Sequence, residues 1–166
     1  VDPPEAAALR LAHRSLYLLG ALDADGGLTA RGAHMARLPL DPSLSAVLLA
    51  AAELRCLAPC AAMCAMAVGD EPFYRAGRAA LVEAAQATRD AYDGPEGDHV
   101  TLWRVYEDWA ALEPRARDSW CRERGLNARA LRTADAVRQQ LLSMARAAGV
   151  RSADDDGDGK GGGGKG

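Results

Sequence analysis

The chain has 166 residues and a formal net charge of −3; 49% of its residues are hydrophobic and 5% are aromatic. This length suits one domain of ordinary size or two small ones. The near-neutral charge excludes a whole-chain electrostatic attraction to nucleic acid or to membranes, so any site for a polyanion must be local.

The apolar content comes largely from alanine, which favours closely packed helices, so we expect an all-α protein. No segment has the length and apolarity of a membrane span, and residues 1–10 lack the charged-then-apolar order of a signal peptide. We therefore expect no membrane partner and an intracellular protein or a piece of one.

The first predicted helix starts near residues 2–5, DPPE, where aspartate can cap and proline suits the first turn. Apolar residues recur at helical spacing up to Gly20, which is placed to end this helix. Residues 23–27, DADGG, form a turn by composition. Thr29 is the expected N-cap of a short helix that carries Met35.

Two apolar helices are predicted in the middle of the chain. Asp41 and Pro42 start the first, which continues to Cys56. The second follows Pro59 and covers residues 60–68, CAAMCAMAV. A helix that is apolar on all sides is normally surrounded by others, which places this one at the centre of a bundle.

The second half contains four further predicted helices, at residues 76–92, 99–112, 118–124 and 126–149. The sequence GPEGD separates the first two, and Asp98 is the expected cap of the helix that follows it. From Ser152 the chain consists almost wholly of Asp, Gly and Lys. Such a segment cannot offset the entropy lost on ordering, so we expect a disordered tail.

Three cysteines, Cys56, Cys60 and Cys64, are spaced by four on what is predicted to be helix. Cysteines one turn apart point along one face, which suits neither mutual disulfides nor a closed tetrahedral metal site. We expect them to be small buried side chains in a reduced compartment. A metal site would need Cys121 or a histidine folded against them.

The tail contains two partial ligand-binding motifs. Residues 159–165 have the G-x-x-x-x-G-K spacing of a phosphate-binding loop, but Gly166 stands where a serine or threonine is needed. Asp154, Asp156 and Asp158 copy the start of a calcium loop, but its twelfth position is Lys165 instead of glutamate. We expect neither site, and no cofactor in this chain.

The last predicted helix has two unlike sides at about 100° per residue. The apolar side carries Ala130, Val137, Leu141 and Met144, with Arg138 at its edge, and the opposite side carries Arg129, Arg132 and Arg146. Guanidinium groups match phosphate oxygens in pairs, so this side could contact a nucleic-acid backbone. A solvated helix surface is the alternative that the composition alone leaves open.

Several segments resemble, in order and nearly in spacing, the C-terminal region of DEAH-box ATP-dependent RNA helicases, especially the pre-mRNA splicing subgroup. They are DPPE, LGALDADGGLT, RGAHMARLPLDPSL, FYR, GDHVTL, VYEDW, WC and NARALRTADAVRQQL. The resemblance implies the latter part of a winged-helix domain at residues 1–42, a helical-bundle ratchet domain at residues 43–150, and a disordered tail at residues 151–166. Two positions differ from the family: Ala76 follows FYR where proline is usual, and LAPC lacks the usual acidic residues.

In this family the two modules flank RecA-like motor domains and help enclose single-stranded RNA. The resemblance therefore implies an accessory RNA-gripping region, with single-stranded RNA and the motor domains as partners and no catalytic residue in this chain. It implies that Arg129 and Arg132 contact the RNA backbone, while Asn127 and His99 have structural roles near the RNA path. ATP and magnesium would belong to the motor of the parent helicase, whose motifs are absent here.

The sequence leaves two alternatives to this function. One is a motorless interaction module that binds glycine-patch activators or spliceosomal proteins, and the other is a helical fragment without activity of its own. The chain starts inside the winged helix, so we expect a piece or a truncated relative of a helicase. The splicing resemblance implies a nuclear location, and without it the location would be cytoplasmic.

Overall fold

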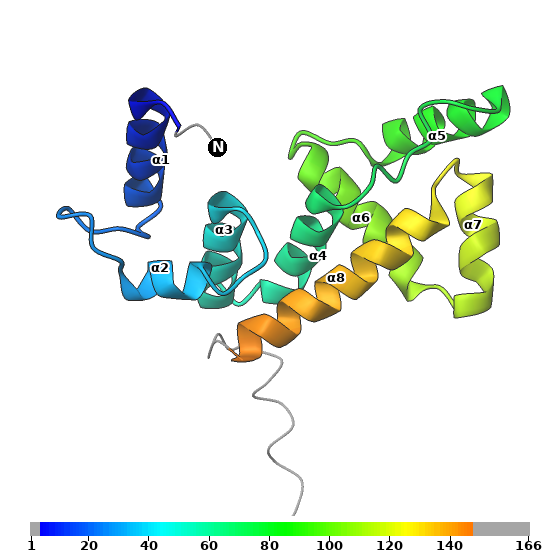
Figure 1. Ribbon diagram of the computed structural model, residues 1–166. Coiled ribbons are helices and arrows are strands. Elements are labelled where there is room, and N and C mark those ends of the chain that lie inside the picture. Colours follow the sequence, from blue (N-terminus) through cyan, green and yellow to red (C-terminus); the bar gives the residue numbers. More distant parts are fainter. Residues whose placement is uncertain (1–3, 148–166) are drawn as a thin grey trace, which may run out of the picture. The chain divides into compact units, whose positions relative to one another are not determined.

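The computed structural model describes residues 4–147, and these form helices joined by short connections (Figure 1). The elements are α1 (Ala6–Leu18), α2 (Ala30–Met35), α3 (Pro42–Glu53), α4 (Leu57–Val68), α5 (Ala79–Tyr92), α6 (Asp98–Ala111), the 3₁₀ helix η1 (Pro114–Ala116), α7 (Arg117–Glu123) and α8 (Ala128–Ala147). The described part contains only isolated β-bridges and no strand, which confirms the all-α prediction. None of its helices has the length and apolarity to cross a membrane. The predicted tail, residues 151–166, lies outside the described residues.

The described chain divides into two compact units. One comprises residues 4–57 and 143–147, and the other is Ala58–Leu142. Each unit is built around its own set of buried side chains.

In the first unit, α1 ends where the sequence predicts. Gly20 has a φ of 74°, which suits a residue without a side chain, and its N–H donates to the carbonyl of Tyr17 at 2.9 Å. The N–H of Ala21 donates to the carbonyl of Leu16 at 2.9 Å, which completes a Schellman motif. The chain therefore turns sharply after α1 with its last carbonyls hydrogen-bonded.

Two predicted caps of the first unit are confirmed. The Thr29 side chain accepts a hydrogen bond from Gly32 N at 2.9 Å at the start of α2. Asp41 Oδ1 accepts from Ser43 N at 2.8 Å and from Leu44 N at 3.2 Å at the start of α3. A small core then closes between these helices; it consists of Ala21, Met35, Ala46 and Leu49, with Leu16 and Leu19 packed against it.

Three predicted helix starts are wrong. Helix α1 begins at Ala6 with Glu5 as its N-cap, so Pro4 precedes the helix and does not lie in its first turn. The N-cap of α6 is Gly97, with a φ of 91°, and Asp98 is the first helical residue without a capping hydrogen bond. Helix α4 begins at Leu57, so Pro59 lies within its first turn, where the missing N–H would have no partner in the helix. Cys56 consequently lies before α4, and the prediction of three cysteines on one helix fails.

In the second unit, α4 is largely enclosed, as its uniform apolarity predicts. Ala61 and Ala65 are 0% exposed, and only the last two residues of this helix are exposed. The largest buried side chain of the unit, Trp109 of α6, is also 0% exposed, and the guanidinium of Arg117 lies 4.3 Å from the centre of its ring. The unit is thus a helical bundle that combines a small-residue helix with buried aromatic side chains, of which Trp109 is the largest.

Candidate nucleic-acid interface

The site begins with two loop segments that are far apart in the sequence. Asn127 N donates to the carbonyl of Pro72 at 2.7 Å, and Tyr74 N donates to the carbonyl of Gly125 at 3.0 Å. Phe73 and Leu126 form an isolated antiparallel bridge between these two bonds. The segment before α5 is thereby fixed to the start of α8.

The bridge directs neighbouring side chains to opposite sides, as a strand would. Phe73 is buried, with 3% exposed, and the guanidinium of Arg89 lies 4.4 Å from the centre of its ring. Tyr74 is 38% exposed. Phe73 therefore fixes the segment to the core while Tyr74 is presented at the surface.

Gly125 permits the close approach of this bridge to α5. Its φ is 60°, and a Cβ at this position would lie 2.2 Å from the carbonyl oxygen of Leu81 and 2.4 Å from Ala85 N. Real Cβ atoms do not approach backbone atoms so closely, so only glycine fits here.

The start of α8 positions the predicted binding residues. Asn127 Oδ1 accepts hydrogen bonds from Arg129 N at 3.0 Å and from Ala130 N at 3.3 Å, so Asn127 caps the helix. Arg129 and Arg132 are exposed. Arg132 Nη1 lies 2.6 Å from Asp118 Oδ1 of α7, an exposed ion pair that holds the guanidinium near the helix start.

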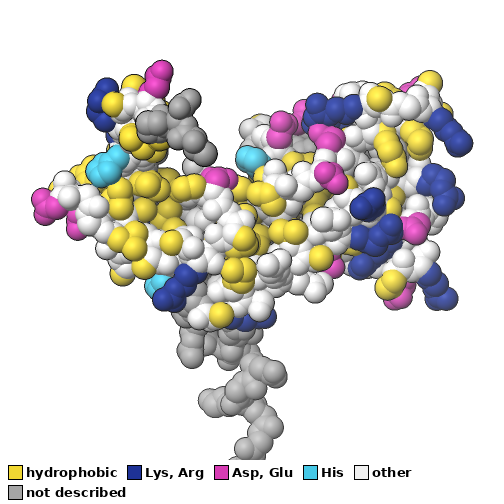
Figure 2. Space-filling view, in the orientation of Figure 1, with side chains coloured by type: hydrophobic (Ala, Val, Ile, Leu, Met, Phe, Trp, Pro, Cys, Tyr) yellow, Lys and Arg dark blue, Asp and Glu magenta, His cyan; other side chains and the backbone are white. Residues whose placement is uncertain are grey.

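These side chains line a groove of about 340 Å³, which we call the α7–α8 groove. Its lining includes Asn127, Arg129 and Arg132 together with Arg122 of α7 and Tyr74. Figure 2 shows arginine side chains gathered on the face where α7 and the start of α8 lie. Three of the four predicted residues thus line one surface feature.

Sequence reasoning missed two residues of this groove. Tyr74 belongs to the FYR motif, but nothing in its local sequence places it beside α8. Arg122 follows Asp118 by four residues on α7, so the helical spacing could have placed it on the face of the Asp118–Arg132 ion pair.

His99 does not belong to this groove. It is exposed in the first turn of α6, and within residues 4–147 its ring makes no hydrogen bond. A structural role of His99 near the RNA path stays a prediction, and no hydrogen bond of its ring within residues 4–147 supports it.

The floor of the groove offers no activated nucleophile. Cys121 is 1% exposed, and burial, followed by the charge of Asp118, raises the pKa of its thiol to about 11. The thiol therefore stays protonated at neutral pH, and only the thiolate is strongly nucleophilic.

The described residues also contain no group of three or more His, Cys, Asp or Glu side chains that could hold a metal ion. The guanidinium donors suit binding of phosphate groups, and the exposed aromatic ring suits stacking on a base.

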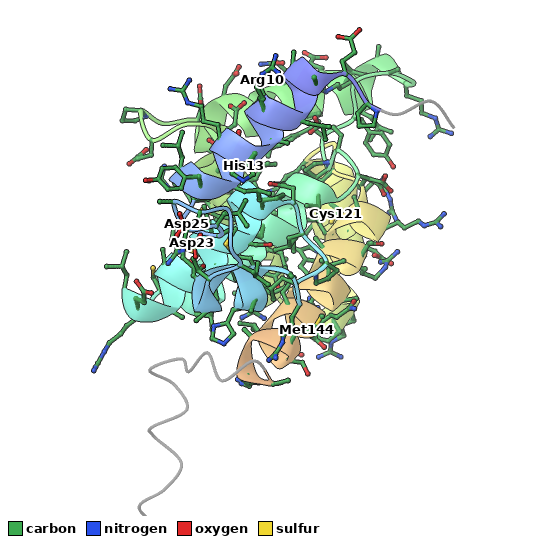
Figure 3. The ribbon with its side chains drawn as sticks, turned by 60° about the vertical axis from the view of Figure 1, so that its left-hand side comes forward. Arg10, His13, Asp23, Asp25, Cys121 and Met144 are labelled. Carbon is green, nitrogen blue, oxygen red and sulfur yellow. The ribbon has the colours of Figure 1, made fainter. Side chains whose placement is uncertain are left out.

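The first unit has a hollow of about 400 Å³ beside α1. Its lining consists of Arg10, His13, Arg14, Tyr17, Asp23 and Ala24. Figure 3 shows His13 close to the turn that contains Asp23 and Asp25. Asp23 Oδ1 accepts hydrogen bonds from the backbone of this turn, at 3.0 Å from Asp25 N and 2.7 Å from Gly27 N, so this carboxylate holds the loop in shape.

Comparison with known proteins identifies two regions. Residues 12–40 match the winged-helix part of the helicase-associated domain (HA2), and residues 41–102 match its ratchet-like part. The chain is also 37% identical over 144 residues to the pre-mRNA-splicing factor ATP-dependent RNA helicase prp22 of Schizosaccharomyces pombe. This alignment covers 87% of the chain and 12% of that relative, so the chain spans a small part of the relative's length.

Proposed function

The chain belongs to the helicase-associated (HA2) domain family and corresponds to the C-terminal region of a DEAH-box splicing helicase, and we propose that it grips single-stranded RNA for an ATP-dependent motor. ATP and magnesium would be bound by the motor domains of the longer helicase, which are the partners of this region. By the same likeness we propose a nuclear location. The finer role, direct contact with RNA, rests on the α7–α8 groove.

The observation that carries this proposal is the grouping of Arg122, Arg129 and Arg132 in one groove. Within the described part of the chain the side chains of Arg122 and Arg129 have no ion-pair partner, so their charge is available to a ligand. Guanidinium groups bind phosphate oxygens in pairs. Contacts of this kind hold a strand without selecting its sequence, which suits a region that grips whatever RNA the motor moves.

The test measures binding of a fluorescent 12-nucleotide single-stranded RNA to the 166-residue chain over a range of salt concentrations. We expect Arg129→Ala with Arg132→Ala to weaken binding and to make its salt dependence shallower. Each lost phosphate contact removes about 0.7 from the slope of log K against log salt, so the two changes together should remove about 1.4.

The matched control is Arg10→Ala with Arg37→Ala, which removes the same charge from exposed positions outside the groove. It should leave the slope near that of the unchanged chain. A thermal melt checks that loss of the exposed Arg132–Asp118 pair leaves the fold intact, as such pairs contribute little stability. An identical binding curve for the groove variant at every salt concentration would refute the assignment.

A second function is favoured by a different observation. Helix α1 has no buried residue, and its Leu11 and Leu18, seven residues apart on one face, are 65% and 71% exposed. Leucines in such a position favour a protein partner. We propose that this face receives a glycine-patch activator or another spliceosomal protein, which would make the chain an interaction module as well.

A further inference from the structure

We propose that Tyr74 is a stacking platform for a base of the bound strand, so that the chain recognises single-stranded RNA through a base as well as through phosphates. This inference rests on the proposed RNA-gripping function. It adds a contact that depends on the presence of a base, which the arginines alone would not supply.

Tyr74 lies between two grooves, because it lines both. The first is the α7–α8 groove, and the second, of about 280 Å³, includes Arg75, Gln86 and Arg89 in its lining. A strand that follows both grooves must pass over Tyr74. The ring is therefore placed where a base between two phosphate contacts would lie.

Both grooves are positively charged although the whole chain has a net charge of −3. The first contains Arg122, Arg129 and Arg132, and the second contains Arg75 and Arg89. Two carboxylates pair with these five arginines: Asp118 with Arg132, and Glu71 with both Arg75 and Arg89. Positive charge remains in excess on both sides of Tyr74, and it suits the backbone of a single strand.

The other aromatic rings nearby are already covered. Arginine guanidinium groups lie over Phe73, Trp109 and Trp120, at 4.4, 4.3 and 4.6 Å from the ring centres. Within residues 4–147 the ring of Tyr74 has no such arginine, and its hydroxyl makes no hydrogen bond. The structure of the chain therefore leaves this ring available for a ligand.

The backbone of Tyr74 is held in place before any ligand arrives. Its N–H bonds to Gly125, and the preceding residue, Phe73, is anchored in the core. A tyrosine side chain has two main rotations to lose, so ordering it costs little. A prearranged aromatic ring between cationic grooves is the arrangement by which proteins bind single strands without sequence preference.

The experiment compares two ligands, a 12-nucleotide oligouridylate and a ribose-phosphate 12-mer without bases, each bound to the 166-residue chain. The variants are Tyr74→Ala, Tyr74→Phe and, as a matched control, Tyr17→Ala, which removes an exposed tyrosine from α1. We expect Tyr74→Ala to weaken oligouridylate binding roughly tenfold. It should leave binding of the base-free ligand and the salt slope of oligouridylate binding unchanged.

The other variants separate stacking from structure. Tyr74→Phe keeps the ring, so it should bind oligouridylate as the unchanged chain does, and Tyr17→Ala should do the same. Equal weakening of both ligands by Tyr74→Ala, or no weakening of either, overturns the stacking role while the RNA grip of the arginines stands. If the unchanged chain binds neither ligand, the proposed function fails and this inference fails with it.

Discussion

Gly125 shows how one residue sets the geometry of the interface. It combines a φ of 60° with backbone atoms of Leu81 and Ala85 at the place where a side chain would start. Any substitution must move α5 or the bridge that presents Tyr74. The residue is therefore needed for the backbone that positions the binding groups, although it has no side chain to offer a ligand.

We predict that Gly125→Ala lowers the free energy of unfolding by about 2 kcal/mol or more. The added Cβ would clash with backbone atoms of α5, and alanine is strained at the positive φ that residue 125 adopts. The measurement is urea unfolding followed by circular dichroism. Gly77→Ala is the control: Gly77 also has a positive φ, of 115°, but nothing lies within 4 Å of its Cβ position. Equal losses for the two variants would show that the close approach contributes nothing.

The local sequence predicts caps well but not the residues that meet across the fold. The N-caps Thr29 and Asp41 were predictable because each bonds to a backbone N–H two or three residues ahead. Asp98 has a suitable side chain just before an apolar helical stretch, but it makes no capping bond, because Gly97 has a positive φ and occupies the N-cap position. The contact of Tyr74 with Gly125 joins residues about fifty positions apart, and no helical or strand period indicates such a pair.

At the scale of elements, a partly buried hydrogen bond links α6 to α8. Tyr106 is 4% exposed, and its hydroxyl donates to Asp135 Oδ1 at 2.5 Å. Burial, and then this hydrogen bond, raises the pKa of Tyr106 to about 12 from a usual value of 10.0. The phenol is therefore held neutral in the folded state at pH values where an unfolded chain would lose the proton.

The sign of the pH dependence follows from this shift. Below pH 10 Tyr106 is protonated in both states, and its contribution to stability is fully present. Between pH 10 and 12 the unfolded state loses its proton first, so stability falls as the pH rises. The pKa of Tyr92 is also raised to about 12, first by burial and then by its hydrogen bond to Asp108, so it adds to the same decline.

We predict that Tyr106→Phe makes the decline between pH 10 and 12 shallower, because one of the groups whose pKa the fold raises no longer titrates, while Tyr92 and Cys121 still do. At neutral pH the variant should be less stable by about 1 kcal/mol, owing to the lost hydrogen bond. Urea midpoints measured at one-unit steps from pH 7 to 12 give both quantities. A decline as steep as that of the unchanged chain would show that Tyr106 is not protected from ionisation in the fold.

Helix periodicity indicates which elements form, but less well where they begin. The arginine side of α8 was predictable from its spacing, and Arg129, Arg132 and Arg146 are all exposed. The start of α4 was not, because Pro59 is compatible both with a position before a helix and with its first turn. A proline therefore limits a helix start to a few residues without selecting one of them.

At the scale of the molecule, two surfaces lie in different compact units. The α7–α8 groove belongs to the unit Ala58–Leu142, and the exposed face of α1 belongs to the other. One surface is cationic and includes an aromatic ring, whereas the other carries exposed leucines. Their chemistry favours different ligands, so the two proposed functions can be separated by substitution.

We predict that Leu11→Asp abolishes binding of a glycine-patch peptide, because it places a charge where an apolar side chain of the peptide would be buried. The same variant should bind single-stranded RNA as the unchanged chain does. Conversely, Arg129→Ala with Arg132→Ala should weaken RNA binding and leave the peptide affinity unchanged. Calorimetry for the peptide and fluorescence anisotropy for the RNA give the four comparisons.

Each outcome of this pair of measurements assigns a function to a surface. Leu11 is 65% exposed, so its substitution should leave the melting temperature nearly unchanged and any loss of peptide binding is local. If the unchanged chain binds RNA but no peptide, the interaction module is refuted and the RNA grip remains. If Leu11→Asp weakens RNA binding as strongly as the arginine variant does, the two surfaces do not act separately. The two functions are supported only if Leu11→Asp loses the peptide but not RNA, and the arginine variant loses RNA but not the peptide. The region would then grip RNA through one unit and receive a protein partner through the other.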